Sequence, residues 1–268
     1  MGLLSSLGIS KKDGVRGGFV RDGVLEFNKE VLSSNGMIVP DASRSRVKEE
    51  YRYVKRPLLI NADGKGAQVV ENGNVIMVTS SQPGEGKTFN AVNLALSIAA
   101  ERDREVLLID ADVIRSDLSR FLDVNRLPGL VNYLTGEVED LSSLLVPTNI
   151  PSLRVLPAGD VHHLATELLA SQNMRQLFGT LSQRGSDLIV IFDSPPLLVT
   201  SEACVLADLV GQICMVVAAE DTRQSMVKEA LSRLSPDPDR IIGFVLNKGR
   251  KHFGSYDYYY YNYYYVQE

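Results

Sequence analysis

The segment "VIMVTSSQPGEGKTFNAVNLALSIAA", residues 75–100, decides the fold of this chain. It begins with an apolar run rich in Val and Ile, passes through a turn that holds two glycines, and ends in an almost wholly apolar stretch. A short apolar run bounded by turn residues is typical of a strand that is buried on both faces of a sheet. The order of strand, glycine turn and buried helix predicts a unit of an α/β domain.

The glycine turn, "SSQPGEGKT", has the spacing of a phosphate-binding P-loop. Gly84 and Gly86 let successive backbone N–H groups turn inward around a polyphosphate, and the N-terminus of the following helix adds positive potential. Lys87 is expected to reach the β and γ phosphates, and the hydroxyl of Thr88 is expected to bind magnesium. Ser81 stands where the motif usually has its first glycine, and a small residue is tolerated there.

The expected nucleotide contacts extend slightly beyond the motif. They comprise Gly84, Glu85, Gly86, Lys87, Thr88, Phe89 and Asn247. Asn247 ends a later apolar run and is a candidate contact to the base of the nucleotide, although Asn at the end of a strand is often only a turn residue.

Further apolar runs follow the P-loop at residues 105–110, 187–193, 212–219 and 241–247, with a shorter candidate at residues 153–159. The segments between them read as helices, at residues 88–100, 165–184, 201–208 and 223–235. This alternation predicts an α/β fold with a mainly parallel central sheet and helices on both faces. Ligands of such sheets bind beyond the carboxyl ends of the strands, so the residues that follow each run matter most.

Three aspartates follow two of these runs. Asp110 and Asp112 end "VLLIDAD", and Asp193 ends "LIVIFD". Magnesium prefers hard oxygen ligands and usually keeps several waters, so the expected metal ligands are Thr88, Asp112 and Asp193, directly or through water. A single Asp at a strand end is often a helix cap, but three of them beside a P-loop favour a functional role.

Composition narrows the class of protein. The 268 residues are 44% hydrophobic and 23% charged, as in an ordinary globular protein, and the net charge of -5 provides no basic surface for nucleic acid. The two cysteines, Cys204 and Cys214, lack metal-ligand spacing, which favours buried, reduced thiols in a cytoplasmic protein. No apolar run reaches the roughly 18 to 20 residues of a membrane-spanning helix.

The two ends of the chain differ from its middle. Residues 1–45 lack sustained periodicity and are expected to form a flexible arm, while residues 46–59 have an amphipathic pattern that predicts a helix ending at Pro57. Residues 46–254 would form the main domain, and residues 255–268 a tail that holds eight of the eleven tyrosines. Such a tail is too rich in phenols to be buried, which leaves stacking, adhesion to a partner or presentation of hydroxyl groups to an enzyme.

This set of motifs resembles the bacterial tyrosine kinase family, the P-loop autokinases of exopolysaccharide and capsule synthesis. "SSQPGEGKT" looks like the Walker A motif of the family, "VLLIDAD" like its Walker A′ motif and "LIVIFDSPP" like its Walker B motif. "GLVNYLTGE", "LPAG", "TELLAS" and the terminal tyrosine cluster also resemble family features, so the likeness covers roughly residues 45–268. It implies a MinD-like three-layer P-loop NTPase fold, with ATP and Mg²⁺ as cofactors.

The resemblance also implies roles for individual residues. Lys87, Asp110 and Asp112 would be catalytic, with Asp110 orienting or deprotonating the attacking tyrosine hydroxyl. The phosphorylated residues would be Tyr256, Tyr258, Tyr259, Tyr260, Tyr261, Tyr263, Tyr264 and Tyr265. Transfer would occur in trans within a homo-oligomeric ring, an octamer by resemblance. The family's E-x-x-R-x-x-R ring motif corresponds to Glu49, Arg52 and Lys55, and Lys55 departs from it because Lys lacks the planar fork of Arg.

The implied partners are a separate membrane-embedded chain-length regulator and a tyrosine phosphatase, with no nucleic acid. The protein would be cytoplasmic and peripheral at the inner face of the cell membrane through that regulator. One rival interpretation is a MinD- or ParA-like ATPase switch, although Gln82 stands where those proteins have an additional lysine. The other is a nucleotide-binding adaptor with a docking tail. A GTP switch is disfavoured because Arg250 replaces the Asp that would bind guanine.

Overall fold

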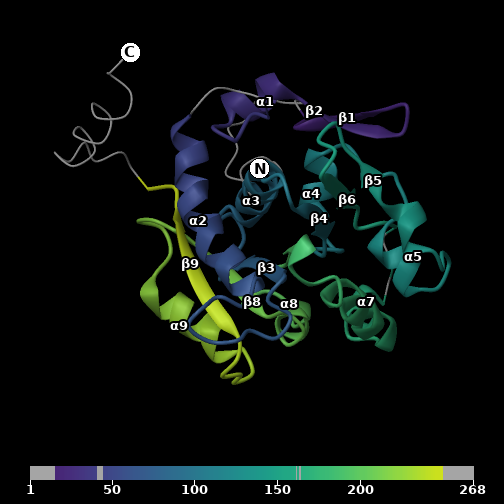
Figure 1. The fold of residues 1–268 in the computed structure, drawn as a ribbon. Helices are drawn as coiled ribbons and strands as arrows, with labels where there is room; N and C mark the ends of the chain where they lie inside the picture. The colour runs from purple at the N-terminus through teal and green to yellow at the C-terminus, as the bar shows by residue number, and fades with distance from the viewer. Residues whose placement is uncertain (1–15, 41–44, 161, 163, 250–268) are drawn as a thin grey trace, which may run out of the picture.

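A seven-stranded sheet forms the centre of the molecule (Figure 1). The structure is a computed structural model, and it describes residues 16–40, 45–160, 162 and 164–249. Its strands, in chain order, are β3 (Val75–Ser80), β4 (Glu105–Asp110), β5 (Val146–Pro147), β6 (Leu153–Leu156), β7 (Leu188–Asp193), β8 (Gln212–Ala218) and β9 (Ile241–Asn247). Their order in the sheet is β5-β6-β4-β7-β3-β8-β9, and every neighbouring pair is parallel except β5 and β6. The predicted mainly parallel sheet is confirmed, whereas the short antiparallel edge strand β5 was not expected.

Helices cover both faces of this sheet. The helices are α1 (Lys29–Ser34), α2 (Arg46–Ala62), α3 (Lys87–Ala99), α4 (Asp117–Phe121), α5 (Leu130–Leu134), α6 (Ala165–Leu169), α7 (Gln172–Ser182), α8 (Glu202–Ala207) and α9 (Gln224–Ser232), with 3-10 turns at Leu141–Leu144 and Gly185–Asp187. Alternate residues of β3 point to opposite faces, so Ile76 packs in the core under α2 and α3, and Met77 packs in the core under α7 and α8. The three-layer α/β architecture is therefore confirmed.

The position of β3 places the P-loop at the centre of one edge of the sheet. β3 lies between β7 and β8, and β4 lies on the far side of β7. Asp110 and Asp193 are directly opposite one another in the register of β4 and β7. Because parallel strands end at the same edge, the aspartates and the P-loop converge there.

Residues 16–40 form ordered structure, so the predicted flexible arm over residues 1–45 is wrong for this segment. β1 (Gly18–Arg21) and β2 (Val24–Phe27) form an antiparallel hairpin, followed by α1. The turn residues Asp22 and Gly23 have φ of 52° and 78°, the signature of the tight hairpin turn that Asp-Gly favours. Residues 1–15 and 41–44 lie outside the described residues, and the domain boundaries stay a prediction.

This N-terminal segment contributes to the main core. Leu25 and Leu32 are fully buried in the cluster that covers the α2 and α3 face of the sheet. The backbone N–H of Ile38 donates to Oδ1 of Asn93 on α3 at 2.7 Å, which fastens the end of the segment to the central helix. An isolated two-stranded hairpin is only marginally stable in water, so the burial of these large apolar side chains is what stabilises the segment.

The helix that was expected to end at Pro57 continues to Ala62. Proline removes one backbone hydrogen bond and normally breaks a helix interior. Here β8 holds the turn that follows Pro57, because Gln212 Nε2 donates to the carbonyl of Leu58 at 3.0 Å and Gln212 Oε1 accepts from Asn61 Nδ2 at 2.8 Å. Tertiary contacts therefore offset the local preference.

Two further expectations are modified. The helix predicted over residues 165–184 is divided into α6 and α7, because the hydroxyl of Ser171 caps a new helix by accepting from the backbone N–H of Met174 at 3.3 Å. Cys204 and Cys214 are free thiols as expected, but only Cys214 is fully buried.

Among the described residues, no helix combines the length and the apolar character needed to cross a membrane.

Truncating Leu25 tests whether the N-terminal segment belongs to the folding unit. We expect Leu25→Ala to lower the free energy of unfolding by about 2–5 kcal/mol, because it leaves a cavity in the core. Val20 faces Leu25 across the hairpin and is 36% exposed, so Val20→Ala is a matched control with a much smaller expected effect. Urea unfolding measures both changes, and equal stabilities of the two variants would show that the segment folds independently of the core.

Candidate active site

Three successive carbonyls of the P-loop are anchored by side chains from outside the loop. Gly84 O accepts from Lys248 Nζ at 2.5 Å, Glu85 O from Asn247 Nδ2 at 2.8 Å, and Gly86 O from Asn90 Nδ2 at 2.9 Å. Within a planar trans peptide the N–H points opposite to the C=O. Carbonyls held outward therefore turn the N–H groups of residues 85–87 toward the inside of the loop, where a phosphate binds.

Gly86 must be a glycine for two reasons. Its φ is 97°, in the left-handed region that other residues rarely adopt, and it immediately precedes α3. A Cβ added at Gly86 would also lie 2.1 Å from Asn247 Nδ2. Asn247 is thus packed directly against the loop, beside the expected nucleotide site.

The side chain of Glu85 belongs to the framework of the loop. It is buried, Oε2 accepts from the backbone N–H of Gln82 at 2.7 Å, and Oε1 accepts from the hydroxyl of Thr222. Thr222 lies just after β8, and its hydroxyl also accepts from the backbone N–H of Ala218 at 3.2 Å. Glu85 therefore ties the P-loop to the neighbouring strand, so the predicted nucleotide contact would come from its backbone.

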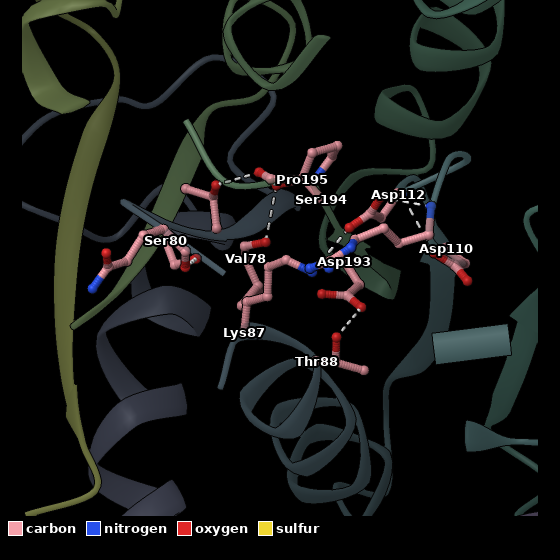
Figure 2. Close-up of polar contacts among 12 residues, drawn as sticks. Val78, Ser80, Lys87, Thr88, Asp110, Asp112, Asp193, Ser194 and Pro195 are labelled. Atoms are coloured by element: carbon pink, nitrogen blue, oxygen red, sulfur yellow. Dashed lines mark hydrogen bonds and ion pairs between the residues drawn. The ribbon is translucent and has the colours of Figure 1, made fainter. Parts of the chain in front are cut away.

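Lys87 and Thr88 face the strand-end aspartates, as Figure 2 shows. Lys87 Nζ lies 3.1 Å from Asp112 Oδ2, and the Thr88 hydroxyl donates to Asp193 Oδ2 at 2.7 Å. All four side chains are buried. The P-loop and the ends of β4 and β7 thus form one continuous polar cluster.

Burial and charge compete in this cluster. Burial alone would lower the pKa of Lys87, but the negative charges of Asp193 and Asp112 outweigh it and hold that pKa above its ordinary value. Burial raises the pKa of Asp193 to about 6, although the Lys87 ammonium and the Thr88 hydroxyl act in the opposite direction. The site therefore holds more negative charge than Lys87 balances.

Asp110 has hydrogen bonds to both of its carboxylate oxygens. It is fully buried, Oδ2 accepts from the backbone N–H of Ser119 at 2.8 Å and from its hydroxyl at 2.6 Å, and Oδ1 accepts from the backbone N–H of Asp112 at 3.2 Å. Burial, together with the charge of Asp193, raises the pKa of Asp110 to about 8 despite the hydrogen bonds from Ser119.

The cluster fits a magnesium ion. Asp193 Oδ1 is buried and has no hydrogen-bond partner among the described residues, while Oδ2 of the same carboxylate meets the Thr88 hydroxyl. In the part of the chain that the structure describes, no group of three or more His, Cys, Asp or Glu residues is suited to hold a metal. One hydroxyl, one or two carboxylates and water make a set that suits Mg²⁺, which binds few protein ligands.

The structure brings together most of the predicted site residues: Gly84, Glu85, Gly86, Lys87, Thr88, Asp110, Asp112, Asp193 and Asn247. Phe89 follows them at the start of α3, and its half-buried side chain packs against the core beneath α2. The eight tail tyrosines and Arg250 lie outside the described residues.

The three residues proposed for a ring interface have different surroundings on α2. Arg52 pairs with Glu49 at 2.6 Å on the exposed side of the helix. Lys55 is buried instead, where its Nζ donates to the carbonyl of Ser97 at 2.7 Å and lies 2.5 Å from Glu101. Its ammonium is thus engaged within the chain.

Sequence reasoning missed five residues of the site: Asn90, Asp117, Ser119, Thr222 and Lys248. Asn90 is a polar residue in an otherwise apolar helix, which is itself a signal of a buried hydrogen bond. Lys248 directly follows the apolar run at residues 241–247, and Thr222 lies in the turn after the run at residues 212–219, at the strand ends where ligand-binding residues concentrate. Asp117 and Ser119 lie in a short helix that lacks a clear pattern.

The chain is similar to known proteins in sequence and in fold. A family model described as an AAA domain matches residues 73–231. The chain is 33% identical over 203 residues to tyrosine-protein kinase wzc of Salmonella typhimurium, an alignment that covers 75% of this chain and 28% of that protein. The chain therefore spans less than a third of the length of that relative.

Shorter relatives match over most of their length. The chain is 35% identical over 175 residues to tyrosine-protein kinase CpsD of Streptococcus pneumoniae serotype 4, covering 65% of this chain and 75% of that protein. The kinase domain of Escherichia coli tyrosine kinase ETK superimposes with a TM-score of 0.64 and 26% identity, over 81% of each chain. On its sequence and its fold, the chain belongs to the bacterial tyrosine kinase family.

Proposed function

We propose that this chain is an ATP-dependent protein-tyrosine autokinase that phosphorylates the tyrosines of its own tail. The observation that carries the proposal is the buried cluster in which Lys87 pairs with Asp112 and Thr88 pairs with Asp193. That cluster lies at the mouth of a preformed phosphate loop, in a chain with eight tyrosines between Tyr256 and Tyr265. The proposed site would bind the phosphate donor, and the chain carries its own acceptors.

The residues of the chain position and neutralise the transferred phosphoryl group. Inward N–H groups of the loop hold the phosphate oxygens, and the Lys87 ammonium exchanges its contact with Asp112 for the β and γ phosphates. Thr88, Asp112 and Asp193 would hold Mg²⁺, which when bound supplies positive charge at the γ-phosphate and favours the ionised carboxylates.

Asp110 is the proposed acceptor for the tyrosine proton, in the ionised form that bound Mg²⁺ would favour, since the raised pKa of this carboxyl keeps it mostly protonated at neutral pH without the metal. Tyrosine with an ordinary pKa near 10 is mostly protonated at neutral pH, so a nearby proton acceptor assists its attack. Both oxygens of Asp110 are engaged by Ser119 and the backbone of Asp112, so a tyrosine hydroxyl reaches this carboxylate only when one of those contacts opens.

We further propose that transfer occurs in trans within a ring, an octamer, in which Glu49 and Arg52 contact a neighbouring subunit. Their exposed position on α2 supports this role, whereas Lys55 is buried and would support the ring only by holding α2 on α3. Each phosphate adds about -1.5 to -2 charges to a tail, so successive transfers would repel neighbouring subunits and open the ring.

The wider context is also proposed. Family membership supports a role in exopolysaccharide polymerisation and export, with a separate membrane-embedded chain-length regulator as activator and a tyrosine phosphatase as its antagonist. The protein would then act in the cytoplasm, at the inner face of the cell membrane, through that regulator.

The central test maps phosphate on the tail. After incubation of the original chain with Mg²⁺ and ATP, mass spectrometry should find phosphate on residues 256–265. Lys87→Met should reduce the amount of this phosphate at least about a hundredfold, because it removes charge stabilisation of the transition state. Circular dichroism of both proteins controls for folding, since Lys87 is buried. ATP hydrolysis with an unmodified tail would instead identify an ATPase switch.

Asp110 should make stability depend on pH. Its pKa of about 8 in the folded chain exceeds the ordinary value of about 3.9, so folding takes up a proton between these limits and the free energy of unfolding falls as pH rises through them. Asp110→Asn cannot ionise at this position, so it should not lose this stability as pH rises. We expect the free energy of unfolding of the variant, minus that of the original chain, to be at least about 1 kcal/mol larger at pH 8.5 than at pH 5. Thermal unfolding without Mg²⁺ measures this, and the exposed Asp103→Asn should show no such difference.

The ring is tested by particle size. Light scattering after size exclusion should show smaller particles for Glu49→Ala and Arg52→Ala, because each removes half of the exposed pair proposed for the interface. Arg46→Ala is the matched control, since Arg46 pairs with Glu50 at 2.6 Å on another face of the same helix. Unchanged size in the first two variants would remove this pair from the interface.

A further inference from the structure

A two-step hydrogen-bonded chain joins α2 to the P-loop. Tyr51 lies on the inner face of α2, where only 5% of it is exposed, and its hydroxyl donates to Asn90 Oδ1 at 2.8 Å. The same amide donates from Nδ2 to the carbonyl of Gly86 at 2.9 Å. Asn90 is buried as well, so water does not readily replace either contact.

The two contacts require the same orientation of the Asn90 amide. If the amide were reversed, its oxygen would face the carbonyl oxygen of Gly86, and both atoms are acceptors. The Gly86 carbonyl, which can only accept, selects the orientation that leaves Nδ2 toward it, and the Tyr51 hydroxyl holds the amide there by donating to Oδ1. Burial raises the pKa of Tyr51 well above its ordinary value, so the hydroxyl keeps the proton that it donates.

The geometry points to Tyr51 as a positioning residue that sets the shape of the P-loop, and so its affinity for nucleotide, according to how α2 is seated on α3. Gly86 is the last residue before α3, and its outward carbonyl orients the N–H of Lys87. The inference rests on the proposed ATP-binding function, because its effect is read at that site.

The seating of α2 is defined at two places along α3. Tyr51 meets Asn90 near the start of α3, and Lys55 meets the carbonyl of Ser97 near its end. The two helices lie close together on one side of the sheet (Figure 1). Glu49 and Arg52 are on the exposed side of this same helix, so a contact that shifts α2 also shifts the Tyr51 hydroxyl.

The test removes one oxygen atom. Tyr51→Phe keeps the buried ring and deletes only the hydroxyl, so we expect about three- to tenfold weaker binding of a non-hydrolysable ATP analogue with Mg²⁺, measured by titration calorimetry. Tyr53→Phe is the matched control two residues away, since Tyr53 is 66% exposed, and it should bind as the original chain does. Equal affinity of all three proteins would overturn the inference.

A double-mutant cycle separates a positioning role from a merely structural one. Because both changes interrupt one pathway, Tyr51→Phe should weaken binding little further in a chain that already carries Asn90→Ala. Fully additive effects, or a fall in melting temperature without a change in affinity, would refute the positioning role of Tyr51.

A second measurement does not need nucleotide. In the nucleotide-free protein, Tyr51→Phe should speed hydrogen exchange of the amides of residues 85–87 relative to Tyr53→Phe, and identical exchange would contradict the inference. If the original chain binds no ATP analogue, the proposed function fails. The exchange experiment still decides whether Tyr51 positions the P-loop.

Discussion

The anchoring of the P-loop carbonyls is the constraint on which the rest of the site depends. A loop with two glycines at positive φ has little intrinsic preference for one shape, and each anchoring hydrogen bond contributes only about 1 kcal/mol. The anchors come from different parts of the chain, Asn90 from α3 and Asn247 with Lys248 from the end of β9. The phosphate site is therefore a product of the sheet order, since β9 must lie beside β8 for its end to reach the loop.

Charge imbalance is the second organising feature. The single ammonium of Lys87 lies close to the carboxyl groups of Asp112 and Asp193, with Asp110 next to them. Buried carboxylates without a matching cation favour protonation, which accounts for the raised pKa values of Asp110 and Asp193. Asp193 Oδ1, which has no hydrogen-bond partner in the part of the chain that the structure describes, is available to additional positive charge. The same excess that destabilises the ionised site without ligand thus prepares it for a divalent cation.

The sequence predicts the centre of this molecule better than its periphery. Continuous Val- and Ile-rich runs identified the five long strands. Four of them, β3, β4, β7 and β8, are buried on both faces, as this composition predicts, whereas β9 lies at the edge of the sheet and leaves Phe244 and Leu246 exposed. The N-terminal hairpin was missed although Asp22 and Gly23 form one of the strongest hairpin signals, because the strands on either side of them have only 4 residues each. The predicted helix end at Pro57 was wrong for a different reason. The hydrogen bonds from Gln212 that stabilise the helix after Pro57 join residues more than 150 positions apart.

Lys55 shows why a local motif does not determine the role of a residue. In sequence it occupies the third place of a charged pattern on one helix, yet in the fold it is the partner of Ser97 and Glu101 on the inner side. A lysine stem can bury its methylenes and carry its ammonium to a carbonyl, which the rigid guanidinium of arginine does less readily. In this chain the outward charge of the pattern is thereby reduced to Glu49 and Arg52, while Tyr51 and Lys55 bind α2 to α3. The helix proposed to contact a neighbouring subunit is also the helix joined to the P-loop by Tyr51 and Asn90, so the proposed assembly and nucleotide binding would share one structural element.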